Sequence, residues 1–99
     1  MEIKIQSIHF NATEKLHDFI EKKLAKLEKQ NDIVKKAEVT LKVVKPETAN
    51  NKEVAIQLLV PGGEVRAEKV CDTFEEGVDL CIDVLRRQLE KVKDKMRGK

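Results

Sequence analysis

The sequence contains no tryptophan and no tyrosine, and phenylalanine occurs only three times. Proteins that read single-stranded RNA stack its bases on aromatic rings, so this shortage excludes most readers of that kind. Two cysteines are too few for a disulfide framework, which makes the cytoplasm the expected location. No apolar run approaches the roughly 18 residues of a membrane span, and the acidic start Met1-Glu2 is not typical of a signal peptide. We therefore expect no membrane partner.

Charge is abundant, but it is distributed unevenly along the chain. Charged residues make up 38% of the sequence, yet the formal net charge is only +2. Residues 68–83 carry six acidic side chains and one basic one, whereas residues 84–99 carry seven basic and two acidic side chains. The near-neutral total therefore hides a strongly basic C-terminal end.

Hydrophobic periodicity predicts the order β-α-β-β-β-α. Apolar residues recur every three or four positions over residues 12–29 and 73–97, which is typical of amphipathic helices. Residues 45–52 form a predicted hairpin loop, and residues 61–63 a tight turn. We predict an α+β domain over residues 1–99, in which two helices pack on one face of a four-stranded sheet and the last three strands form an antiparallel meander. Alternating apolar residues predict the four strands over residues 2–8, 37–44, 53–60 and 64–70.

The side chains that could carry out chemistry do not converge in the sequence. His9 and His17 fall on different predicted elements, and neither they nor the cysteines show the spacing of metal ligands. Cys71 ends a strand, whereas Cys81 lies in the apolar stripe of the second helix and is predicted to be a buried small side chain. We therefore predict that the chain is not an enzyme and uses no metal, no cofactor and no small-molecule substrate.

The basic side chains form stripes on both predicted helices. Lys23 lies close to the apolar stripe of the first helix, where a lysine can either snorkel to solvent or point into a groove beside the second helix. The carboxylates of Glu75, Asp79 and Asp83 are interpreted as a solvated face of the second helix. Helical spacing predicts three groups of cations. One edge of the first helix carries Lys15, Lys22, Lys26 and Lys29. The two opposite flanks of the second helix carry Arg87, Lys91 and Lys95 on one side and Arg86, Lys93 and Arg97 on the other.

Two interpretations of these stripes differ in whether the cations have acidic neighbours. A solvated helix face would balance its charges in pairs four residues apart, but the last sixteen residues offer two acids to seven bases. Unpaired like charge repels itself and is usually retained for a partner, of which a phosphate backbone is the obvious one. Without an aromatic platform, recognition would depend on RNA shape and phosphate geometry.

The sequence resembles a known family, the short form of the ribosome hibernation-promoting factors, also called ribosome-associated translation inhibitors. The similarity covers essentially the whole chain. Two departures are Val84, where the family usually has lysine, and Gly77, where alanine is usual. The motifs that carry the resemblance are Ile3-Lys4-Ile5, Ala12-Thr13, Leu16, Phe19-Ile20 and residues 22–29 at the start; Val54-Ala55-Ile56, Pro61-Gly62-Gly63 and Ala67-Glu68 in the middle; and Val78-Asp79, Leu85, Arg87-Gln88-Leu89, Lys91, Lys93 and Lys95 in the last helix.

The resemblance implies a fold similar in shape to double-stranded-RNA-binding domains. It also implies translation regulation under slow growth, stress or stationary phase, when the protein would occupy the tRNA and mRNA channel of the small ribosomal subunit. A basic groove between the two helices would hold ribosomal RNA, and the chain would form a single ribosome-binding domain. The rRNA-binding residues that the resemblance implies are Lys22, Lys23, Lys26, Arg86, Arg87, Lys91, Lys93 and Lys95.

Two other functions remain open from the sequence alone. A general double-stranded-RNA-binding module of the same shape would bind a generic duplex as well as it binds ribosomes. A small structural or regulatory protein without a nucleic-acid partner would bind neither at any salt concentration.

Overall fold

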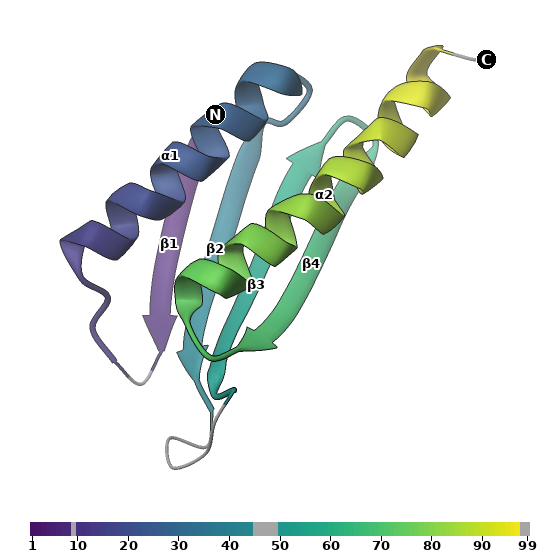
Figure 1. Ribbon diagram of the computed structural model, residues 1–99. Helices are drawn as coiled ribbons and strands as arrows, with labels where there is room; N and C mark the ends of the chain where they lie inside the picture. The colour runs from purple at the N-terminus through teal and green to yellow at the C-terminus, as the bar shows by residue number, and fades with distance from the viewer. Residues whose placement is uncertain (9, 45–49, 98–99) are drawn as a thin grey trace.

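Four strands and two helices follow one another in the predicted order β-α-β-β-β-α (Figure 1). This computed structural model describes residues 1–8, 10–44 and 50–97, with side chains up to residue 95. His9 and most of the hairpin loop predicted over residues 45–52 lie outside these described residues. The elements are β1 (Glu2–Ile8), α1 (Glu14–Gln30), β2 (Lys36–Val43), β3 (Lys52–Val60), β4 (Gly63–Cys71) and α2 (Phe74–Arg97).

The strands form one mixed sheet in the order β1-β2-β3-β4. The last three strands pair antiparallel, which confirms the predicted meander, and β1 pairs parallel to β2. In this register Val39 lies opposite both Ile5 and Ile56, and Ile56 lies opposite Ala67. These four apolar residues make one row across the sheet, so each strand contributes alternate side chains to the same buried face.

Threonine side chains begin both helices. Thr13 Oγ1 accepts a hydrogen bond from the Leu16 backbone N–H at 3.1 Å, and Thr73 Oγ1 accepts one from the Glu76 N–H at 3.1 Å. Each satisfies one of the backbone donors that the first turn of a helix leaves unpaired. At the end of α1, the buried Asn31 side chain donates to the Leu27 carbonyl at 3.1 Å. Threonine is therefore the N-cap of both helices.

The core lies between the sheet and the two helices, which cover the same face (Figure 1). Ile20 and Leu24 of α1 and Leu85 of α2 are completely buried, and each contributes roughly 1.5–3 kcal/mol by leaving water. Gly77 sets how closely α2 approaches β3, because a Cβ added there would lie 2.7 Å from Val54 Cγ2. A small residue at position 77 therefore fixes the depth at which α2 packs on the sheet.

The helices run in the same direction, and the C-terminal turns of α2 project past the end of the sheet (Figure 1). A helix of 24 residues is about 36 Å long, whereas the nine residues of β4 extend over about 30 Å. The Gln88 side chain donates to the Arg66 carbonyl of β4 at 3.3 Å. This contact fixes which flank of α2 faces β4 and which faces α1.

Candidate nucleic-acid interface

A cleft of about 330 Å³ lies between α1 and α2. Its cations are Lys23 and Lys26 from α1 and Arg86 from α2, so the structure brings together three of the residues predicted to bind rRNA. They meet because four-residue spacing on α2 places Asp79, Asp83 and Arg86 along the flank that faces α1. Lys23 points toward α2 across this cleft, which is the second of its two predicted alternatives.

Two of the three cations in the cleft are paired with carboxylates. Lys23 Nζ lies 3.0 Å from Asp79 Oδ1 and 5.4 Å from the centre of the Phe19 ring. Arg86 forms an ion pair with Asp83 at 3.5 Å. The four charged side chains of these pairs are 40–57% exposed, so water screens the pairs and an incoming anion can compete for the cations.

Asp79 and Asp83 are exposed, as expected for a solvated face, and both also line the cleft. The cleft therefore holds two negative charges among its three positive ones and is not uniformly basic. Sequence spacing already indicated that these acids lie beside a cation, since Asp79, Asp83 and Arg86 share one edge of the helix. Which edge faces α1 depends on tertiary packing, and the local pattern does not give it.

Arg87, Lys91 and Lys95 lie on the other flank of α2, and all three are exposed. No carboxylate of the described residues lies within 4.0 Å of these cations. They do not enter the cleft with Lys23 and Arg86 but form a separate surface, here called the outer stripe. The outer stripe leaves three positive charges available to a partner.

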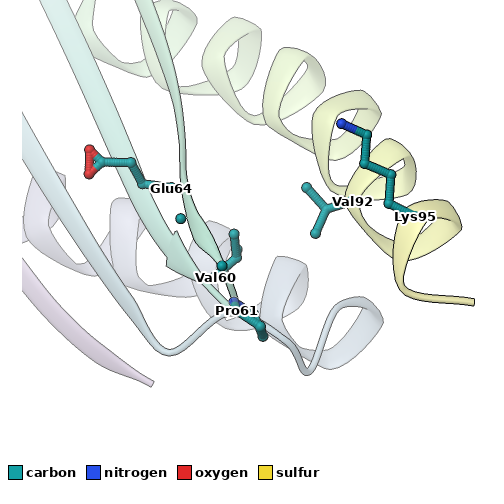
Figure 2. Close-up of a pocket in the computed structure, with 7 residues that line it drawn as sticks. Val60, Pro61, Glu64, Val92 and Lys95 are labelled. Carbon is teal, nitrogen blue, oxygen red and sulfur yellow. The ribbon is translucent and has the colours of Figure 1, made fainter.

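Lys95 also stands at a second hollow, of about 360 Å³, beside the turn between β3 and β4 (Figure 2). Its floor is formed by Val60, Pro61 and Val92, and Glu64 lines it as well. Gly62 adopts φ +84°, the conformation that the second central residue of a tight Pro-Gly turn requires. The C-terminal end of the outer stripe therefore lies beside a tight turn of the sheet.

The remaining predicted residues, Lys93 and Lys22, lie outside both groups. Lys93 faces α1, where its Nζ donates to the Gln30 carbonyl at 2.9 Å and satisfies one of the last acceptors of that helix. Lys22 is exposed on α1 and does not line the cleft. Arg97 cannot be assigned a side-chain position, because its side chain lies outside the described residues.

Other kinds of site find little support in the part of the chain that the structure describes. No group of three histidine, cysteine or carboxylate side chains there could hold a metal ion. Cys81 is fully buried, as predicted, and burial raises its pKa to about 11, which keeps the thiol protonated at neutral pH. The phenylalanines are engaged within the molecule, because Phe10 and Phe74 stack at 4.7 Å and Phe19 lies under Lys23. The described helices include none with the length and apolar character to span a bilayer.

Comparisons with known proteins identify the family of the chain. The family model described as "Sigma 54 modulation protein / S30EA ribosomal protein" matches residues 3–97. The ribosome hibernation promoting factor of Escherichia coli K12 is 35% identical over 97 residues, which cover 98% of each chain. The factor of the same name from Pseudomonas putida KT2440 is 33% identical, over 99% of this chain and 92% of the relative.

Solved structures show the same fold. The N-terminal domain of Thermus thermophilus Protein Y superposes with a TM-score of 0.76 at 30% identity, over 93% of this chain and 99% of that one. A ribosomal subunit interface protein from Coxiella burnetii superposes with a TM-score of 0.85 at 24% identity, over 95% and 99% of the two chains, and shows the fold alone. From the residues matched and the fold, the chain belongs to the Sigma 54 modulation protein / S30EA ribosomal protein family, and the relatives that it resembles include ribosome hibernation promoting factors.

Proposed function

We propose that this chain is a translation silencer that binds the small ribosomal subunit. It occupies the tRNA and mRNA channel through the cations of α1 and α2 and keeps ribosomes inactive during slow growth or stress. It acts in the cytoplasm, as a single ribosome-binding domain, by occupancy rather than by a chemical reaction.

The observation that carries this proposal concerns the outer stripe of α2. Among the described residues, no carboxylate oxygen lies within 4.0 Å of the charged nitrogens of these cations. Three unpaired cations on a rigid helix repel one another unless a polyanion is bound. The name of the curated relatives, ribosome hibernation promoting factor, supports the ribosome as the source of that polyanion. Ribosomal RNA supplies phosphates at the spacing that helical cations can follow.

The proposed contacts follow from the geometry of the two surfaces. Arg87, Lys91 and Lys95 bind rRNA phosphates from the outer stripe, and Lys26 binds one at the mouth of the cleft. Lys23 and Arg86 join them when a phosphate takes the place of their carboxylate partners. Lys22 and Lys93 add long-range attraction near the two ends of this surface. A domain fixed in this way would exclude tRNA and mRNA from the same channel.

A competition experiment separates this function from general binding of double-stranded RNA. Labelled chain is bound to purified bacterial small subunits at moderate salt, and unlabelled subunits or a generic RNA duplex are added as competitors. We expect the subunits to compete at concentrations about 1,000-fold or more below the duplex, which is the lower end of the usual ratio of specific to non-specific nucleic-acid binding. Equal competition would instead support the general RNA-binding module, and binding to neither competitor would refute both functions.

A further inference from the structure

The cleft between α1 and α2 contains charges that oppose the proposed partner. Asp79 and Asp83 line it together with Lys23, Lys26 and Arg86. Any polyanion that enters must approach two carboxylates, which repel phosphate. A surface selected only for tight binding to RNA would not place acidic side chains beside its cations.

Each carboxylate also holds one cation in a defined position. Asp79 Oδ1 lies 3.0 Å from Lys23 Nζ, and the Phe19 ring lies 5.4 Å away from the same ammonium group. The lysine side chain, although 40% exposed, is thereby restrained by a ring and a carboxylate. Asp83 restrains Arg86 at 3.5 Å.

Arg86 has a further feature that favours a ligand in the cleft. Asp83 contacts the guanidinium through Nη1, and the Arg86 side chain remains 43% exposed where it lines the cleft. A phosphate placed to accept from this guanidinium offsets the repulsion by the carboxylates, whereas a misplaced phosphate experiences only the repulsion. The Nε, which is shielded from solvent and has no hydrogen-bond partner within the described structure, is out of reach of such a ligand.

We propose, on the basis of the function proposed above, that Asp79 and Asp83 are specificity-determining residues, which reject nucleic acids whose phosphates do not match the cleft. Specificity depends on a difference in affinity, and a repulsive group that penalises the wrong partner increases that difference. The outer stripe attracts any polyanion, and the two carboxylates of the cleft decide which polyanion is retained. Their role is distinct from that of the cations, because their removal strengthens binding to the wrong ligand.

The test is the double variant Asp79→Asn/Asp83→Asn, which removes both charges and preserves the size of the side chains. A unit charge about 6 Å from a phosphate in water contributes on the order of a threefold change in affinity. We therefore expect affinity for a generic RNA duplex to rise about tenfold for the double variant. Affinity for small subunits should rise no more than about twofold, because the matched phosphates already interact with the paired cations.

Glu90→Gln/Asp94→Asn is the matched control, since these acids lie on the same helix, are exposed and do not line the cleft. It changes the net charge equally and should shift both affinities by the same factor. Far-UV circular dichroism of each variant checks that the helices are intact. The readout is the affinity for small subunits divided by the affinity for the RNA duplex. A purely structural role of the aspartates would not lower this ratio.

The outcomes separate this inference from the function on which it rests. A lower ratio for Asp79→Asn/Asp83→Asn than for the control supports the inference. If the unmodified chain binds small subunits selectively but the two double variants give the same ratio, the specificity role is refuted while the function stands. If the unmodified chain shows no preference for subunits, both are refuted.

Discussion

The two flanks of α2 carry similar cations but hold them in different states. On the flank that faces α1, Arg86 is paired with Asp83 and Lys93 donates to the Gln30 carbonyl, while Lys23 reaches across to Asp79. On the outer stripe, Arg87 and its two neighbours have no acidic partner among the described residues. Equal counts of positive residues therefore do not mean equal attraction for RNA. The outer stripe provides free charge, whereas the cleft provides shape and restrained donors.

The largest expected effect comes from reversing the outer stripe. The triple variant Arg87→Glu/Lys91→Glu/Lys95→Glu should weaken small-subunit binding about 100-fold or more, because three phosphate contacts become three repulsions. Co-sedimentation with purified subunits at moderate salt measures the loss. Its matched control is Lys4→Glu/Lys35→Glu/Lys42→Glu, which reverses three lysines of β1, β2 and the segment before β2 and should retain binding within a few-fold. Equal losses in the two variants would mean that net charge alone governs binding.

A smaller effect distinguishes the cleft from the rest of α1. Lys26 lines the cleft and has no acidic partner among the described residues, whereas Lys22 is exposed outside it. We expect Lys26→Glu to weaken subunit binding about tenfold and Lys22→Glu about two- to threefold, since the first faces the phosphate directly and the second acts through solvent. The same co-sedimentation titration compares them. Identical losses would show that the cleft has no special part in binding.

The salt dependence of binding should also differ between the two flanks. Replacing Arg87, Lys91 and Lys95 with alanine should lower the slope of log affinity against log salt by about 2–3, because each free cation displaces counterions from one phosphate. Lys23→Ala/Arg86→Ala should lower it by about 1 or less, since ion pairs already neutralise these cations in the unbound chain. Affinities measured over roughly 50 to 300 mM salt give the slopes. Equal slopes for the two variants would remove the distinction between free and paired cations.

The sequence was sufficient for the elements and for most of the buried face. Apolar residues recur every two positions in a strand with one solvated face and about every 3.6 positions in an amphipathic helix. Ile56 and Leu85 are therefore identifiable as core residues from spacing alone. The parallel pairing of β1 with β2 was not predictable in this way, because alternation records which face is buried and not which strand lies adjacent.

The candidate site was only partly predictable, for a similar reason. Helical spacing separated Arg87 from Arg86 by the apolar seam, and the structure places them on the two flanks accordingly. Spacing could not tell which flank meets α1, so it missed that Asp79 and Asp83 enter the cleft. Charges on one helix acquire partners from another helix only through tertiary packing. For Lys23, its position near the apolar stripe was the one local sign that it reaches the neighbouring helix.

The smallest expected effect concerns stability. Lys23→Ala should lower the free energy of unfolding by about 0.2–1 kcal/mol, because an exposed ion pair and a contact with the Phe19 ring are lost. Arg87→Ala should leave it unchanged within about 0.5 kcal/mol, since that side chain has no ion-pair partner among the described residues. Urea denaturation followed by circular dichroism measures both. A larger loss for Arg87→Ala would show that the outer stripe supports the fold rather than a partner.

The most direct test of the central claim is displacement of tRNA from small subunits. Labelled tRNA is bound to purified bacterial small subunits programmed with mRNA, and the chain is added in increasing amounts. We expect tRNA to be released as one chain binds per subunit, whereas Arg87→Glu/Lys91→Glu/Lys95→Glu should release none at the same concentrations. Stable co-sedimentation of tRNA and the unmodified chain on the same subunit would contradict it.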